Sequence, residues 1–184
     1  MHLLNRAQAK PATRYQEQTE SIEAFHALDI PTMIKTLEQT HHYEERERMT
    51  EVDALLNKIL LVHYEHHGEE LLALHTLYSQ LQMELLQHFA REEKEIFPLM
   101  LRNPIPSKEI LDQLEDLEGE HDVAGNLIHQ IQERSNQFSI PEDACHTYEK
   151  TYIRMKQLTE DIFVHIFKEN SILFPKYRKQ LIEQ

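Results

Sequence analysis

The sequence predicts an all-α protein folded as an antiparallel up-down-up-down four-helix bundle. Glycine occurs only three times in 184 residues, and no run of alternating β-branched residues indicates a strand. Four long stretches instead carry apolar residues at helical spacing, and the segments between them are short. Because short connections join antiparallel neighbours, we expect these stretches to pack together as one bundle.

The chain divides into a short lead and one domain. Residues 1–28 are polar and mixed, which indicates a flexible lead or a short helix ahead of a bundle domain at 29–184. Asp29 is followed two residues later by proline, which is typical of a helix start. The apolar residues that follow predict one long helix ending near His63, with residues 64–68 as the turn.

The other three helices are recognised by their ends, and we expect them at 69–97, from Ser107 onward, and from Ser139 to about 173. Ser107 is a good N-cap. Ser139-Ile-Pro-Glu142 has the spacing of a capping box, in which a serine and a glutamate three residues later satisfy the first amides of a helix. Pro98 and Pro175 are expected to perturb the ends of the second and fourth helices.

The composition excludes several classes of function. The net charge is −13 with a pI near 5.4. The sequence contains no cluster of basic residues of the kind that binds nucleic acid. No apolar stretch approaches the roughly 20 residues that span a bilayer, and the N-terminus lacks a signal-peptide core. We therefore expect a cytoplasmic protein without a membrane partner. The single cysteine, Cys145, excludes an internal disulfide.

A motif that occurs twice, H-x3-E-x4-F-P, is the most specific feature of the sequence. It runs from His88 through Glu92 in the first copy and from His165 through Glu169 in the second. Residues four apart lie on one face of a helix, so each copy offers an imidazole nitrogen and a carboxylate in the same direction. Two such helices facing each other would form a two-metal site. Accidental polar pairs are disfavoured because the copies agree at four positions.

The helix before each motif supplies one more histidine. On the third helix this is His121, which lies on the apolar face within E-H-D-V-A-G. On the first helix both His41 and His42 are candidates, and His41 fits the apolar stripe better. With thirteen histidines in the chain, four imidazoles and two carboxylates at these positions suit iron, manganese or zinc.

Two metal ions that each need about six ligands would have only six protein ligands between them, so the ions must share some of these ligands. We expect Glu92 and Glu169 to bridge the two ions, together with a solvent-derived oxo or hydroxo group, leaving one position open. Glu84, one turn before His88, and Glu120, beside His121, are candidates to hold a ligand imidazole by a hydrogen bond. A solvated helix face is the alternative interpretation for both.

His63, His66 and His67 form a second cluster, at the expected first turn. His63 and His67 are four residues apart and could hold a surface metal. A solvated turn is the favoured interpretation.

The metal-binding pattern resembles the hemerythrin-like (HHE cation-binding) domain over about residues 30–175. It most resembles the di-iron branch that repairs iron–sulfur clusters after nitrosative or oxidative stress. The motifs that carry the resemblance are His42 with Arg46, Val62-His63, His88 to Pro98, Glu120 to Gly125, and His165 to Pro175. The resemblance favours His42 over His41 as the first-helix ligand, because Arg46 and His63 follow it at the spacing of that branch.

The resemblance implies two irons per chain, although recombinant material can carry zinc or manganese instead. It also implies a role in the stress response: iron–sulfur cluster repair, iron donation or nitric oxide handling, with damaged iron–sulfur proteins or O2 and NO as partners. That branch often carries an N-terminal segment with adjacent cysteines, and residues 1–28 contain none. This difference motivates an alternative function. The protein would then be an oxygen sensor, a redox sensor or an iron-binding module, and it would catalyse no reaction. A di-iron oxidase or peroxidase that uses the open position is a second alternative.

Overall fold

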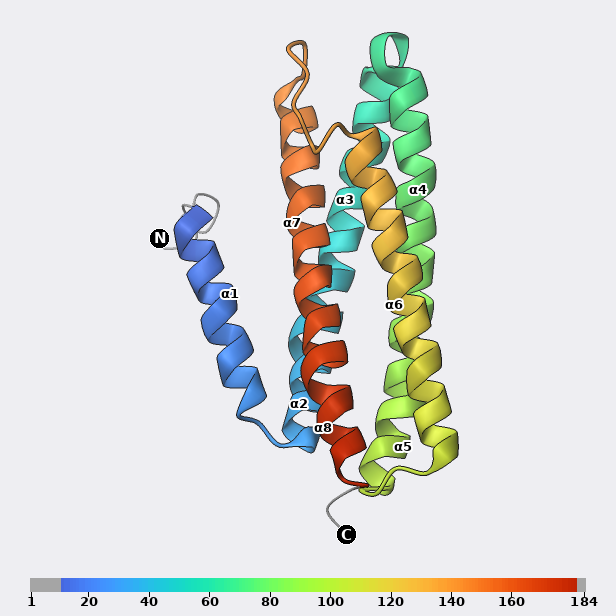
Figure 1. The fold of residues 1–184 in the computed structure, drawn as a ribbon. Helices are drawn as coiled ribbons and strands as arrows, with labels where there is room; N and C mark the ends of the chain where they lie inside the picture. Colours follow the sequence, from blue (N-terminus) through green and yellow to red (C-terminus); the bar gives the residue numbers. More distant parts are fainter. Residues whose placement is uncertain (1–10, 182–184) are drawn as a thin grey trace.

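The computed structural model describes the backbone of residues 11–181 and the side chains of residues 19–181. Within this part of the chain there is no strand, and four long helical rods run alternately up and down (Figure 1). The rods are α2 (Ile30–Thr36), η1 (Leu37–His42) and α3 (Tyr43–Val62); α4 (Tyr64–Arg91), η2 (Glu92–Ile96) and α5 (Phe97–Arg102); α6 (Lys108–Arg134); and α7 (His146–Lys168), η3 (Glu169–Leu173) and α8 (Phe174–Lys179). The predicted four-helix bundle is confirmed.

One further helix, α1 (Pro11–His26), precedes the bundle and stands beside α7 in Figure 1. The lead predicted at residues 1–28 is thus helical over most of its length, while residues 1–10 lie outside the described part. Phe25 anchors α1, since its ring is buried and lies 5.3 Å from the Lys168 ammonium. Lys168 also donates a hydrogen bond to the Ser21 hydroxyl, so α1 is attached to α7 by its C-terminal half.

The first and third rods begin as the sequence indicates. Asp29 caps α2 by accepting a hydrogen bond from the Thr32 amide, and Ser107 caps α6 by accepting one from the Ile110 amide. The turn between α3 and α4 is shorter than predicted. It consists of His63 alone, because the His67 amide already bonds to the His63 carbonyl at 2.8 Å. Gly68 lies inside α4, and its missing side chain leaves room for the Tyr64 ring.

The prediction that the fourth rod begins at Ser139 is wrong. The helix starts at His146, and residues 136–138 take positive φ values of 47°, 58° and 59°. Such a left-handed run costs roughly 1 kcal/mol or more per residue for side chains other than glycine. Here it is stabilised by the Ser135 hydroxyl, which accepts the Phe138 amide at 3.1 Å, and by burial of the Phe138 ring.

Pro98 and Pro175 do not end their rods. In each copy of the motif the phenylalanine amide before the proline bonds to the carbonyl of the glutamate five residues earlier, Phe97 to Glu92 and Phe174 to Glu169. This pairing makes a π turn, which is wider than an α turn and is frequent at functional sites. Because proline has no amide hydrogen and its ring clashes with the carbonyl four residues back in an α-helix, the wider turn lets helix α5 or α8 follow.

The apolar core consists of two clusters, one towards each end of the bundle. The His42 ring marks where they meet. Its centroid lies 4.5 Å from Phe89 of one cluster and 6.0 Å from Phe97 of the other. The buried histidines and glutamates of the bundle therefore occupy a layer between two apolar regions.

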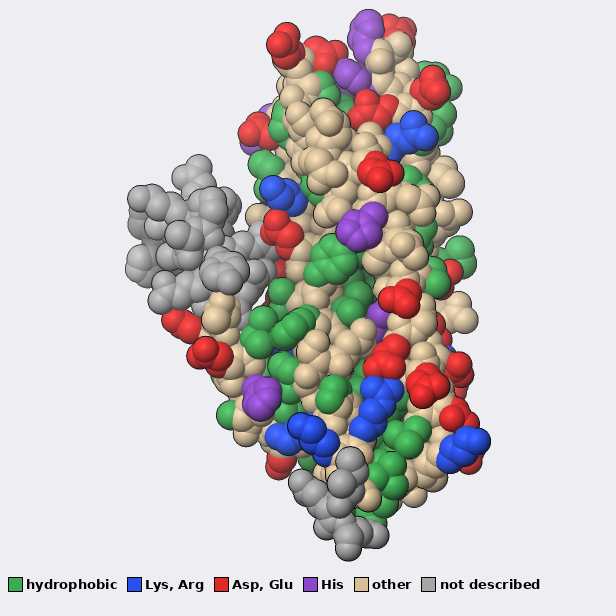
Figure 2. All heavy atoms as spheres, in the orientation of Figure 1, with side chains coloured by type: hydrophobic (Ala, Val, Ile, Leu, Met, Phe, Trp, Pro, Cys, Tyr) green, Lys and Arg blue, Asp and Glu red, His purple; other side chains and the backbone are tan. Residues whose placement is uncertain are grey.

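The surface carries the acidic excess of the chain. On the face in Figure 2, Asp and Glu side chains are spread along the length of the bundle. Among the described helices, none is both long and apolar enough to cross a membrane.

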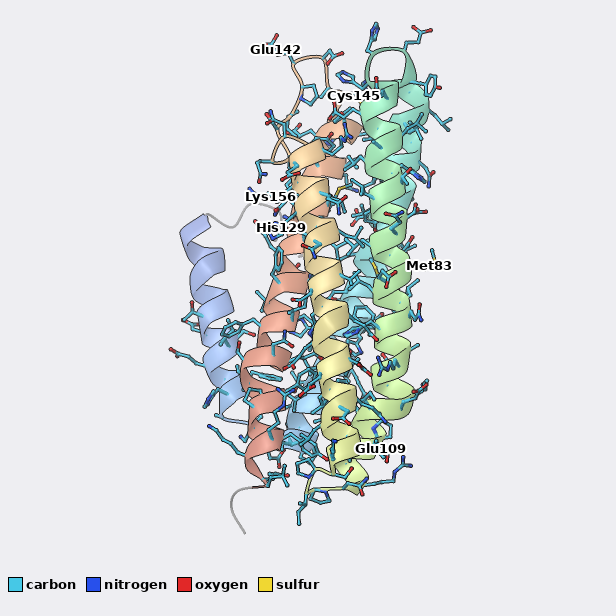
Figure 3. All side chains as sticks on the ribbon, turned by 45° about the vertical axis from the view of Figure 1, so that its right-hand side comes forward. Met83, Glu109, His129, Glu142, Cys145 and Lys156 are labelled. Carbon is cyan, nitrogen blue, oxygen red and sulfur yellow. The ribbon has the colours of Figure 1, made fainter. Side chains whose placement is uncertain are left out.

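The histidine cluster at the α3–α4 turn pairs with the loop before α7. Figure 3 shows Cys145 at this end of the bundle, and the His63 Nε2 lies 3.2 Å from its sulfur. His67 contacts the Asp143 carboxylate at 2.9 Å, and His66 is exposed. The hydrogen bond from His63, with the amides at the start of α7, lowers the pKa of the exposed Cys145 thiol to about 7.

This pKa predicts a pH-dependent reactivity. Alkylation of Cys145 by iodoacetamide should reach half its maximal rate near pH 7, since only the thiolate reacts. In a His63→Asn variant the midpoint should rise towards the ordinary thiol value of about 8.5. Stopped-flow or mass-spectrometric labelling between pH 5 and 10 measures both midpoints. An unchanged midpoint in the variant would contradict the role of His63, and a His66→Asn variant is the matched control.

Candidate metal centre

The structure brings together all six residues that the sequence singles out as metal ligands. They are buried, with exposed fractions between 0% and 5%, and come from all four rods: His42, His88, Glu92, His121, His165 and Glu169. Three of the six lie at the edge of a π segment. His42 is the last residue of η1, whereas Glu92 and Glu169 are the first of η2 and η3. The departures from α-helical geometry thus coincide with the site.

The Nε2 atoms of the four histidines point towards the two carboxylates. His42 Nε2 and His88 Nε2 lie 3.2 and 3.4 Å from Glu92 Oε2. His121 Nε2 and His165 Nε2 each lie 3.2 Å from an oxygen of Glu169. Atoms bound to one metal ion at about 2.1 Å are separated by about 3.0 to 3.4 Å, so this spacing fits metal coordination.

Two groups of four potential ligands result. His42 and His165 form one with Glu92 and Glu169, and His88 and His121 form the other with the same two glutamates. Within each group the ligand atoms lie within 4.8 Å of one another. Both glutamates belong to both groups, which is the arrangement that two bridged metal ions require.

Each imidazole is held from its other side by an oxygen atom. The Nδ1 atoms of His42 and His88 lie 2.9 Å from Glu93 and 2.6 Å from Glu120. Those of His121 and His165 lie 2.8 Å from the Asn170 amide oxygen and 3.2 Å from Glu45. Since these oxygens accept hydrogen bonds, Nδ1 carries a proton in each ring, and a ring that is neutral presents the lone pair of its Nε2 to the centre.

The polar atoms at the centre fit a cation. Both oxygens of Glu92 and of Glu169, and Nε2 of His42 and of His165, are buried without a hydrogen-bond partner among the described residues. The Nε2 atoms of His88 and His121 face each other at 2.9 Å. Buried lone pairs that converge in this way are costly unless a positive charge lies between them. Nitrogen and carboxylate donors together suit iron, manganese or zinc.

Protons balance the charges where no metal does. Burial and the neighbouring Glu169 raise the pKa of Glu92. Burial also opposes ionisation of Glu169, but the nearby His165 and His121 hold the pKa of Glu169 well below its usual range. Although burial disfavours the charged imidazole, Glu169 and Glu45 raise the pKa of His165 well above its usual value. Metal binding must therefore displace protons from the site.

His41, the alternative first-helix ligand, lies beside the six residues. Its Nδ1 is 3.4 Å from Glu45 Oε1, and its Nε2 is 3.0 Å from the Lys168 ammonium. Its ring stacks on His165 at 4.9 Å. The geometry thus favours His42 as the ligand and gives His41 a supporting contact.

Of the two glutamates predicted to hold an imidazole, Glu120 contacts His88 and also accepts a hydrogen bond from Arg91. These hydrogen bonds lower the pKa of Glu120. Glu84 does not take this role in the structure. It is exposed and lines a surface pocket together with Gln80 and Val123.

Three supporting residues were missed by the sequence interpretation: Glu45, Glu93 and Asn170. One signal was available, because Glu93 and Asn170 both follow the glutamate of the repeated motif directly. Glu45 gave no such signal, although it is buried and the imidazoles of His165 and His41 hold its pKa at about 2 against the effect of burial.

Fold and site together define a class, the four-helix bundles that enclose a cation between histidines and glutamates. The chain matches the hemerythrin HHE cation binding domain over residues 32–177 and belongs to this family.

Several relatives are named as iron–sulfur cluster repair proteins. The chain is 29% identical over 155 residues to the iron–sulfur cluster repair protein ScdA of Staphylococcus haemolyticus, a match that covers 82% of this chain and 68% of the relative. It is 29% identical over 150 residues to the iron–sulfur cluster repair protein YtfE of Cronobacter sakazakii, covering 82% and 66%. The YtfE of Escherichia coli O157:H7 is 26% identical over 181 residues, covering 91% and 81%.

The buried carboxylates predict opposite effects on stability and metal binding. In metal-free protein, Glu92→Gln should leave the free energy of unfolding unchanged or raise it by about 1–2 kcal/mol, because a neutral amide replaces a carboxyl group whose ionisation is opposed by burial and by Glu169. The additional stability conferred by bound metal should be lost. Urea unfolding with and without metal tests both effects. Glu84→Gln, at an exposed position, is the matched control; a strongly destabilised metal-free Glu92→Gln variant would contradict the prediction.

Proposed function

We propose that this protein is a non-haem di-iron protein that acts in iron–sulfur cluster repair during nitrosative or oxidative stress in the cytoplasm. The observation that carries the proposal is the pair of four-ligand groups that share Glu92 and Glu169. The relatives named as iron–sulfur cluster repair proteins support iron as the metal and damaged iron–sulfur proteins as partners.

The six residues would hold two iron ions, with Glu92 and Glu169 as the bridging carboxylates. Bound iron would supply redox chemistry and the binding of diatomic molecules such as NO. The protein keeps each histidine in the tautomer that presents Nε2 to the centre, through the hydrogen bonds at Nδ1. The buried rings of Phe89 and Phe97 stack on the His42 ring and give this ligand an apolar surrounding.

Metal content tests the di-iron proposal. Protein purified without oxygen from iron-replete cells should contain about two irons per chain, and its visible spectrum should change on exposure to air. A Glu92→Ala, Glu169→Ala double variant should lose both the iron and the spectrum. Zinc or manganese found in recombinant material should be replaceable by iron after chelation. A single metal ion per chain after iron-replete expression would contradict the proposal.

Repair itself is tested with a damaged cluster enzyme. A dehydratase inactivated by nitric oxide or peroxide should regain activity faster with the iron-loaded protein than with an equal amount of free iron and reductant. Iron-loaded wild-type protein that gives no advantage over free iron would contradict repair.

Two other functions share the same centre. An oxygen or redox sensor would form a stable, reversible O2 adduct and restore no enzyme. An oxidase or peroxidase would consume peroxide much faster than free iron does. The relatives favour repair over both.

A further inference from the structure

The two metal positions are related by an approximate internal symmetry. The motif glutamates Glu92 and Glu169 are equivalent, as are His88 and His165. The symmetry also relates His42 to His121, and it exchanges the two groups of four ligands. We call the group with His42 and His165 position A, and the group with His88 and His121 position B.

The hydrogen bonds behind the histidines break this symmetry. At equivalent places in the two motif copies, Glu93 holds His42 of position A and Asn170 holds His121 of position B. A carboxylate behind an imidazole makes its other nitrogen a stronger donor to a metal, whereas a neutral amide orients the ring without adding negative charge. The residue after the motif glutamate thus decides how strongly the histidine of the preceding helix binds.

The second pair of supporting carboxylates differs in burial. Glu45, behind His165 of position A, is 1% exposed, whereas the Glu120 side chain, behind His88 of position B, is 33% exposed. Water screens a partly exposed charge, so Glu120 contributes less to ligand strength than Glu45 does.

Neighbouring cations reduce this difference only in part. Arg46 contacts Glu93 at 2.8 Å, and Arg91 contacts Glu120, so each position has one arginine on a supporting carboxylate. Position A has one further cation, because Lys168 contacts His41 and acts electrostatically on Glu45, which partly offsets the charge of that carboxylate. Position A therefore has two carboxylates behind its imidazoles, and position B has one carboxylate and one amide.

We infer that the two metal positions are unequal, with position A retaining its ion and position B releasing and rebinding its ion, and that Asn170 sets this difference. The inference rests on the proposed pair of metal ions and deepens it. A protein that donates iron needs an exchangeable ion, and position B would supply it while the ion at position A would continue to balance the two buried carboxylates.

Release kinetics test the inference independently of any enzyme activity. Protein loaded with zinc, which is redox-silent, is mixed with an excess of a chromogenic chelator, and released zinc is followed by absorbance. Wild-type protein should release two ions in two phases, with rates at least about 10-fold apart, since outer hydrogen bonds to a ligand change metal affinity by roughly 10–100-fold. A His121→Ala variant should lose the fast phase and retain the slow one.

Two isosteric variants separate the two positions. Asn170→Asp places a carboxylate behind His121 and should slow the fast phase by about 10-fold or more. Glu93→Gln removes the carboxylate behind His42 and should accelerate the slow phase. Because both substitutions conserve shape, circular dichroism and unfolding midpoints should stay near those of the wild type.

The outcomes distinguish this inference from the proposed function. Two zinc ions released at one rate, with no effect of Asn170→Asp, would overturn the unequal positions and leave the two-metal site standing. Fewer than two ions per chain in the loaded wild type would overturn both. A fast phase that survives His121→Ala would also overturn the inference, since it would assign the exchangeable ion to position A.

Discussion

The convergence of two buried carboxylates and four imidazole lone pairs is the constraint on which the rest of the structure depends. Glu92 and Glu169 have no hydrogen-bond partner among the described residues. A folded chain can bury such groups only if a cation or protons balance them and if rigid elements hold them in place. The second condition is visible here. Each imidazole is fixed at Nδ1, and the ligand layer lies between two apolar clusters that hold the rods together on either side.

The sequence singled out the six residues that converge in the structure because their pattern is repeated. His88 with Glu92 and His165 with Glu169 share a spacing that has one simple explanation on a helix. His121 followed from its place on an apolar face. The choice between His41 and His42 could not be made from periodicity, because the π segment η1 shifts the register of the helix face at these residues. Apolar periodicity assumes an unbroken α-helix, and here it favoured His41, the residue that supports the site from outside.

Other features depend on contacts between rods, which local patterns do not encode. Glu45 supports His165 from a different rod, so nothing near His165 in the sequence identifies it. The start of the fourth rod was misplaced because the segment with capping-box spacing forms a loop instead, in which the Ala144 amide bonds to the Pro141 carbonyl and Cys145 is the N-cap. Pro98 and Pro175 were interpreted as helix ends because an α-helix cannot accommodate them, whereas the π turn before each proline can.

The π turns connect the local sequence to the chemistry of the site. Each begins at the glutamate of the repeated motif and closes on the phenylalanine before the proline, so one short motif places a carboxylate at the centre and extends the rod beyond it. The next residue, Glu93 or Asn170, is thereby directed to the histidine of the preceding rod. Two copies of this unit build a nearly symmetric site, and a single substitution at that next position is enough to make its two halves chemically different. The inferred donation of one ion is compatible with the fold, because an ion retained at the other position would continue to balance the two buried carboxylates.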